Sequence, residues 1–364
     1  MHGIRSTQPA ERQRRDCRRC GKAGPMAAAI CAGKEFRSML TIVMYHYVRP
    51  LAGSRYPRLK ALELAAFRAQ LDHLERHYRP VTMEQVIAVW RGQQTLPEQA
   101  VLLSFDDGYR DHLEHVLPEL ERRGLQGSFF PCTGTLRDGL ILDVNKIQFV
   151  LASVASTVEL LPALARALDK RRERHGLGTY EDIHRRVYHR LSRQGRFDDP
   201  DTLFFKRLLQ RELPFEVRHD VIDELFARFV STDQRAFAEM LYLSDAEVRQ
   251  LHEAGMHIGC HGDQHFWFDS LTPEQQGRDL EVSLAHLRNL GVLGDDWVMC
   301  YPYGGVDEAL LGRLRQLGCA AGLTVASRQA DPARDDPLLL PRLDTNDLPS
   351  QAAACPGDPA TVQV

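Results

Sequence analysis

The chain has 364 residues, of which 43% are hydrophobic, and it carries 46 basic against 49 acidic side chains. That length can bury one large core with insertions, and the near-neutral charge argues against a nucleic-acid partner or a polyanionic substrate. Since no stretch approaches the roughly 18 consecutive apolar residues of a spanning helix, we also expect no membrane span.

The two ends of the chain lack the periodic apolar pattern of packed elements. Residues 1–38 are rich in arginine and are expected to be disordered, as is the tail of residues 349–364. The first strand pattern begins directly after Met39, which suggests that translation starts there. Eight cysteines are spread along the chain without the density of a disulfide scaffold, so we expect reduced thiols and a cytoplasmic location.

The first half of the predicted domain, residues 40–135, alternates strands and helices. Residues 41–46 form an apolar, β-prone run that ends at His46, and residues 61–76 have helical spacing. Residues 101–105 form a short buried strand that ends at Asp106 and Asp107. A helix over 112–123, closed by Gly124, leads to a further strand at 127–132.

Residues 140–240 are dense in Arg, Leu and His and show no clear strand pattern, which predicts a helical insertion or lid. Helices are expected over 158–174, 180–193 and 220–230. The segment 142–147 mixes polar residues into an apolar run just after a strand, so Asp143 and Lys146 are candidate substrate contacts. Alternatively, Asp143 only caps a helix that starts at Val144.

The alternating pattern resumes from Ser244 to about Leu348. Ser244 and Glu247 form a capping box on a helix that ends near Gly255, and a strand then runs into His261. Helices over 273–290 and 308–317 flank a strand at 297–301. Repeated β–α units of this kind predict an α/β fold with a parallel barrel, closed or nearly closed, over residues 39–348.

Ionisable side chains follow several of these strands. Asp106 and Asp107 follow one, and His261 and His265 stand four apart, on one helical turn or on either side of a tight loop. Two His and one Asp give a divalent metal three ligands and leave a position open for water, as in catalytic zinc sites. Taken singly, the Asp pair is more typical of a turn and the His pair of a solvated helix face. The pairing of the two motifs favours a metal site.

These motifs, in this order, resemble the first two signatures of the polysaccharide deacetylases, carbohydrate esterase family 4, whose catalytic domain is the NodB homology domain. Residues 298–305 resemble the third signature, with Cys300 where the family usually has an arginine. That substitution, together with Tyr45 and His46 near the start of the domain, resembles the poly-N-acetylglucosamine deacetylase subgroup. The resemblance implies a distorted seven-stranded (β/α) barrel.

The resemblance also implies roles for individual residues. Asp107, His261 and His265 hold a divalent ion, with zinc preferred over Co²⁺, Ni²⁺ or Fe²⁺. Asp106 is the general base, His46 the general acid, and the backbone N–H of Tyr303 stabilises the oxyanion. Four further side chains are expected to contact the substrate: Tyr45, Tyr109, Tyr301 and Pro302.

The missing arginine needs a substitute. Arg342, at the end of the last predicted strand, is the candidate for a bidentate pair with Asp106, and Asp344 is a candidate to orient His46. An exposed Arg–Asp pair near the end of the chain is an equally good interpretation.

The chain is therefore expected to be a metal-dependent N-deacetylase of an N-acetylated sugar or glycan, acting in surface polysaccharide synthesis. Two alternatives remain open: an amide hydrolase of the same fold that acts on a cyclic amide or ureide, and a non-catalytic glycan-binding relative. The sequence does not predict the sugar or the oligomeric state.

Overall fold

The computed structural model describes residues 38–193, 195 and 198–348. The predictions for residues 1–37 and for the tail 349–364 lie outside the described residues. The strands are β1 (Leu40–Tyr45), β2 (Arg79–Pro80), β3 (Ala100–Asp107), β4 (Gly127–Pro131), β5 (His257–Ile258), β6 (Val298–Cys300), β7 (Ala321–Leu323) and β8 (Leu343–Asp344).

All ladders between these strands are parallel. One sheet has the order β5-β4-β3-β1-β8, with β2 beside β3, and a second sheet pairs β6 with β7. Parallel bridges join the two sheets on both sides, Cys260 to Met299 and Leu323 to Leu340. Seven strands thus form a ring, which is the predicted distorted barrel, and because they run in parallel their carboxyl ends meet at one rim.

The two faces of β3 belong to different parts of the core. Ala100 and Leu102 pack with residues of β1, β4, β6 and β7, whereas Leu103 and Phe105 pack against the outer helices. This alternation follows from the two-residue period of a strand. It places Ser104 and Asp106 in the inward-facing row.

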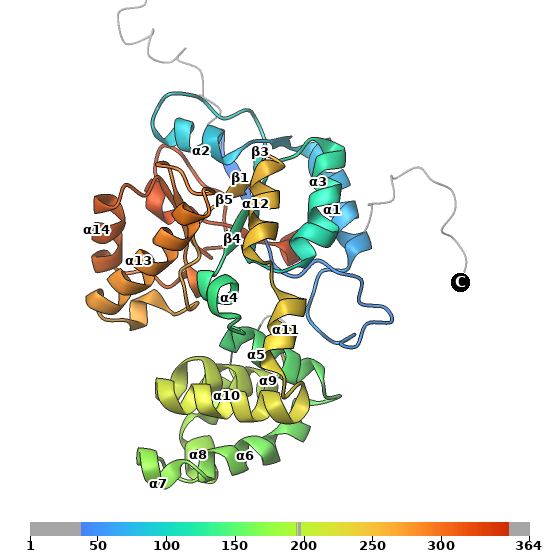
Figure 1. The fold of residues 1–364 in the computed structure, drawn as a ribbon, viewed down its shortest axis with the longest axis vertical. Coiled ribbons are helices and arrows are strands. Elements are labelled where there is room, and N and C mark those ends of the chain that lie inside the picture. The colour runs from blue at the N-terminus through green and yellow to red at the C-terminus, as the bar shows by residue number, and fades with distance from the viewer. Residues whose placement is uncertain (1–37, 194, 196–197, 349–364) are drawn as a thin grey trace, which may run out of the picture. The chain divides into compact units, whose positions relative to one another are not determined.

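Helices cover the barrel and build the insertion (Figure 1). Those around the barrel are α1 (Leu64–His77), α2 (Met83–Trp90), α3 (Leu117–Arg123), α4 (Thr133–Asp138), α12 (Asp245–Glu253), α13 (Pro273–Asn289) and α14 (Glu308–Gln316). The insertion contains α5 (Asp143–Ala152), α6 (Leu161–Asp169), α7 (Arg172–His175), α8 (Tyr180–Leu191), α9 (Pro200–Arg207), α10 (Phe215–Phe229) and α11 (Gln234–Leu241). The insertion helices share a hydrophobic core to which Tyr47, Leu59, Tyr109 and Cys132 of the barrel part of the chain also contribute.

Some predicted elements have different limits in the structure. The helix expected over 158–174 is divided into a 3-10 turn, η2 (Thr157–Leu160), then α6 and α7, and Pro162 stands in the first turn of α6. The helix over 112–123 begins as a π-turn, η1 (His112–Val116), ahead of Pro118. Proline cannot donate the backbone hydrogen bond of a helix interior, so it favours these new starts.

Across the described part of the chain, no single helix is long and apolar enough to cross a membrane. Helix α5 and the η2–α6 segment meet that test only as a pair, and they are bent by 112° relative to each other.

Gly108 limits how the chain can leave β3. It has φ +71°, and a Cβ placed there would lie 2.7 Å from Cβ of Pro131. We expect Gly108→Ala to lower the free energy of unfolding by about 2 kcal/mol or more, because left-handed strain and a clash add together. Urea unfolding monitored by circular dichroism measures this change.

Gly124 provides the matched control. It also has a left-handed backbone, with φ +65°, but nothing lies within 4 Å of a Cβ added there. Gly124→Ala should therefore cost only about 1 kcal/mol. Equal losses in both variants would show that contact with Pro131 is not a constraint.

Candidate metal and catalytic site

The two neighbouring aspartates at the end of β3 face different surroundings because the backbone turns at Asp107. Asp107 has φ +72°, a conformation that is unfavourable for residues other than glycine. Among the described residues, only Gln99, Asp107, His265 and Tyr303 combine a side chain with positive φ. Three of these four belong to the predicted site, and such strain is typical of sites where side-chain direction is functionally constrained.

Asp106 makes a bidentate ion pair with Arg342 inside the barrel rim. The guanidinium donates to Oδ1 at 2.9 Å and to Oδ2 at 2.8 Å, and also to Ser104 Oγ at 3.2 Å. The two side chains are 2% and 1% exposed, so the pair is withdrawn from water. Arg342 thus makes the bidentate pair with Asp106 that we expected of the residue replacing the missing arginine.

Arg342 also controls the charge of Asp106. Burial alone would raise the pKa of Asp106, but the charge of Arg342, aided by His261 and His46, lowers it to about 2. The thiol of Cys300 donates to Asp106 Oδ1 at 3.4 Å. Asp106 is therefore held as a carboxylate throughout the neutral pH range.

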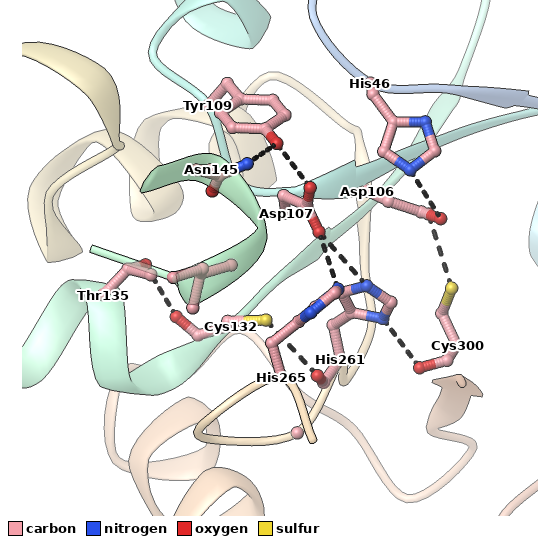
Figure 2. A network of polar contacts seen from close by, with 12 residues as sticks. His46, Asp106, Asp107, Tyr109, Cys132, Thr135, Asn145, His261, His265 and Cys300 are labelled. Atoms are coloured by element: carbon pink, nitrogen blue, oxygen red, sulfur yellow. Dashed lines mark hydrogen bonds and ion pairs between the residues drawn. The ribbon is translucent and has the colours of Figure 1, made fainter. Parts of the chain in front are cut away.

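Asp107 and the two histidines converge on one point (Figure 2). Asp107 Oδ1 lies 3.3 Å from Nε2 of His261 and 3.2 Å from Nε2 of His265. This oxygen is buried and lacks a hydrogen-bond partner among the described residues. His261 donates its Nδ1–H to the carbonyl of Cys300 at 2.7 Å, which leaves Nε2 available as a ligand. One carboxylate oxygen and two imidazole nitrogens are a donor set suited to a divalent metal.

The histidines stand on a loop rather than on a helical turn. Gly262 and His265 both have positive φ, and Asp279 of α13 accepts the backbone N–H groups of Asp263 and Gln264 at 2.8 and 3.2 Å. Asp279 was not predicted from the sequence, because the contact joins residues on different elements. Its carboxylate fixes the loop that presents both imidazoles.

A buried polar network fixes the other oxygen of Asp107. Tyr109 donates its hydroxyl to Asp107 Oδ2 at 2.5 Å, and Asn145 of α5 donates to the Tyr109 oxygen at 2.7 Å. Asn145 also donates to Tyr47 at 2.8 Å and accepts from Tyr242. The helical insertion thereby contacts the candidate metal ligand through Asn145, a residue that the sequence interpretation passed over in favour of its neighbours.

His46 lies on the open side of Asp106. Its Nε2 is 3.9 Å from Asp106 Oδ2, and its side chain is 42% exposed, so solvent or a substrate can reach it. Its backbone carbonyl accepts a hydrogen bond from His112 Nε2 at 3.0 Å. Burial lowers the pKa of His112 to about 4, which keeps that imidazole neutral. Asp344, expected as a candidate to orient His46, instead caps the 3-10 turn η7 (Thr345–Asp347).

The predicted substrate contacts separate into two groups. Asp143 lines a cleft that also contains His265 and Tyr303, the residue predicted to stabilise the oxyanion. Asp143 is the first residue of α5 and makes no capping hydrogen bond; its carboxylate contacts His219 Nδ1 at 3.2 Å. The structure therefore does not support the alternative interpretation, in which Asp143 only caps a helix.

The remaining predicted contacts need correction, because their side chains are buried away from the cleft. Tyr45 packs between Phe67 and Phe105, and the Tyr301 hydroxyl donates to the Leu338 carbonyl. Lys146 is 1% exposed and pairs with Asp223 of α10 at 2.5 Å, so it fastens α5 to α10. Pro302 is buried, and Tyr109 is buried and donates to Asp107, so neither lines the cleft.

Two thiols lie close to the candidate ligands. Cys132 Sγ, Asp107 and His261 have ligand atoms within 4.8 Å of one another, as do Cys300 Sγ, Asp106 and His261. Burial raises the pKa of both cysteines, which keeps them as thiols. Neither was singled out as a ligand from the sequence, because no Cys-x-x-Cys spacing marks them.

Comparisons with known proteins support the family resemblance. Residues 226–322 match the family model for polysaccharide deacetylases. The poly-beta-1,6-N-acetyl-D-glucosamine N-deacetylases of Escherichia coli K12 and O157:H7 are each 36% identical over 80 residues, which is 22% of this chain and 12% of each relative. The chain thus spans only a small part of these curated relatives.

Solved deacetylases share the fold at low sequence identity. The Streptococcus pyogenes deacetylase PplD, in complex with acetate, aligns with TM-score 0.51 and 14% identity, over 85% of this chain and 92% of that chain. IcaB from Ammonifex degensii aligns with TM-score 0.50 and 19% identity, over 84% and 91%. The predicted resemblance to polysaccharide deacetylases and their distorted barrel is thus confirmed.

Removing any one ligand should empty the metal site. We expect Asp107→Ala, His261→Ala and His265→Ala each to lose bound metal and activity together, because a site with three protein ligands cannot readily spare one. Elemental analysis of the purified variants measures the metal. Full occupancy in His265→Ala would exclude that residue from the ligand set.

Tyr109→Phe is the control for that series, since it removes only the hydrogen bond to Asp107 Oδ2. Loss of such an outer partner typically weakens metal affinity by about 10–100-fold without abolishing binding. The variant should therefore fill with metal when excess ion is supplied.

Arg342→Gln should move the acid limb of the pH profile. Without the guanidinium, burial raises the pKa of Asp106, so the carboxylate takes up a proton at a higher pH than in the wild type. Activity should then be lost earlier as the pH falls. The profile of kcat/KM against pH measures this shift, and Arg342→Lys, which keeps the charge, should shift it less. An unchanged acid limb in folded Arg342→Gln would contradict control of Asp106 by this pair.

Proposed function

We propose that this chain is a metal-dependent hydrolase that removes the acetyl group from an N-acetylated sugar or glycan. One observation carries the proposal. An Asp107 oxygen that has no hydrogen-bond partner among the described residues lies between two imidazole nitrogens, and beside it stand a separate, ionised carboxylate, Asp106, and His46. A ligand set, a base and an acid are the groups that hydrolysis of an amide requires. The similarity to polysaccharide N-deacetylases supports the acetamido sugar as substrate class.

Asp107, His261 and His265 would hold the metal, for which we propose Zn²⁺, although the same donors accept Co²⁺, Ni²⁺ or Fe²⁺. When bound, such an ion polarises the amide carbonyl and lowers the pKa of water towards ~7. Since Tyr109 occupies Oδ2 of Asp107, the carboxylate presents only Oδ1 to this position.

The remaining roles fall to side chains that do not hold the ion. Asp106, kept ionised and oriented by Arg342, accepts a proton from the attacking water. His46, as imidazolium, gives a proton to the departing amine, which would otherwise have to leave as an anion. The Tyr303 backbone N–H is proposed to stabilise the oxyanion, in keeping with the turn that positive φ creates at this residue.

We further propose that the enzyme works in the cytoplasm, on a precursor of a surface polysaccharide. The four cysteines in the described part of the chain, Cys132, Cys260, Cys300 and Cys319, are free, which is in keeping with a reducing compartment.

His46→Gln should separate amide from ester hydrolysis. Because an amine needs a proton to leave, the variant should keep its metal and fold but lose about 100-fold or more on the acetamide. An activated aryl acetate has a leaving group that needs no proton, so its hydrolysis should fall much less. Parallel assays of both substrates give the ratio. Equal losses would assign His46 to substrate positioning.

The function itself is tested by amine release from a panel of N-acetylated sugars, nucleotide sugars and glycan oligomers. Acetamido sugars should release a free amine, and a chelator should stop the reaction until metal is restored. Hydrolysis confined to cyclic amides or ureides would overturn the proposal.

A further inference from the structure

A cleft extends from the candidate site towards the helical insertion. Its volume is about 720 Å³, and it lies between the beginnings of α5 and α10, the loop after His265, and α13. His265 and Tyr303 line one part of it, and Phe215 and Arg218 of α10 line another. A group bound in this cleft would therefore be continuous with a sugar at the metal site.

Aromatic rings line the cleft in two groups. The Tyr303 ring lies 4.6 Å from the His265 ring and stacks on Trp267 at 4.3 Å, with 4° between their planes. Phe266 meets Phe215 at 5.4 Å. Such a surface suits the flat apolar face of a sugar ring or of an attached carrier.

The cationic groups of the cleft have fewer partners than its carboxylates. Arg218 and Arg278 line the cleft, and within the described part of the chain neither makes an ion pair; Arg218 donates only to the Gln210 carbonyl. Burial lowers the pKa of Arg218, and the nearby charge of Asp143 only partly offsets this effect. Arg211, above the Trp267 ring at 4.6 Å, differs from both because it pairs with Asp269 at 3.2 Å.

The acidic side chains of the cleft are already engaged. Asp143 contacts His219, and Asp263 accepts the Thr133 hydroxyl at 2.7 Å. Asp279 accepts two backbone N–H groups. Arg218 and Arg278 are thus the cleft-lining cations without an ion pair among the described residues, whereas Asp143 pairs with His219 and Asp263 with Arg137.

We infer that this cleft binds a phosphate group attached to the acetylated sugar, with Arg218 and Arg278 as its principal contacts. Guanidinium groups match the oxygens of phosphate through paired hydrogen bonds. A nucleoside diphosphate and a lipid diphosphate both offer this chemistry, so the substrate would be a carrier-linked sugar rather than a neutral glycan. The inference deepens the proposed function and depends on it for the reaction, but not for phosphate binding.

The binding test uses the metal-loaded protein and inorganic pyrophosphate, followed by calorimetry. Pyrophosphate should bind, and Arg218→Gln should weaken it by about 10-fold or more. Arg278→Gln gives a second reading that does not disturb the bond to Gln210. Arg228→Gln is the matched control, since Arg228 stands on the same helix over the Phe229 ring and does not line the cleft. No binding, or equal binding by all variants, would overturn the inference.

The substrate test compares deacetylation of N-acetylglucosamine linked to methanol, to phosphate, to a nucleoside diphosphate and to a long-chain alkyl diphosphate. The phosphate-bearing compounds should have the higher kcat/KM, and Arg218→Gln should reduce this advantage while sparing the methyl glycoside. The diphosphate compound with the higher kcat/KM identifies the carrier, and a preference for either compound supports the proposed phosphate site. Preference for a uronate-linked or neutral sugar would overturn it. If no acetamide is cleaved but pyrophosphate still binds through Arg218, the proposed function fails and the phosphate site stands.

Discussion

Two adjacent, buried carboxylates cannot both remain ionised unless each has its own compensating partners. The structure meets this constraint by turning the backbone at Asp107. Asp106 keeps the inward direction of β3 and meets Arg342, while Asp107 is redirected to His261, His265 and Tyr109. Because each carboxylate has a separate environment, one can act as a base while the other binds a metal. The barrel places Asp106 in the inward-facing row of β3, where its side chain meets that of Arg342.

The same arrangement explains how a chain with cysteine at the usual arginine position can retain an oriented carboxylate. Cys300 provides only a thiol hydrogen bond to Asp106, whereas Arg342, 236 positions after Asp106 in the sequence, provides the charge. The helical insertion contributes in a different way. Asn145 supports Tyr109 behind the metal position, and α10 supplies the arginine-bearing wall of the cleft. The candidate metal ligand Asp107 and the cleft thus both depend on contacts with a segment that lies outside the barrel.

The barrel strands and the rim residues could be predicted because parallel strands end at a common edge and because His46, Asp106, Asp107 and His261 each follow an apolar run. Side chains on helices were harder to assign, because the rotation of α5 depends on packing. That packing turns Asn145 to the site and Lys146 to Asp223, although both lie in one short segment. Tyr45 and Tyr301 were misassigned because the sequence alone does not distinguish an aromatic residue that lines a substrate groove from one that packs in the core. Asp279 and Cys132 reach the site only through tertiary contacts, for which the sequence has no local pattern.

The most direct test of this account is X-ray absorption spectroscopy of the zinc-loaded enzyme, which reads the ligand atoms themselves. With Asp107, His261 and His265 as ligands, the first shell should contain only nitrogen and oxygen at about 2.0–2.2 Å, with the outer-ring scattering of two imidazoles. Cys132 and Cys300 lie close to the candidate ligands, so a sulfur ligand is the alternative that this measurement can detect. A sulfur shell at about 2.3 Å would contradict the assignment and place a thiolate on the metal.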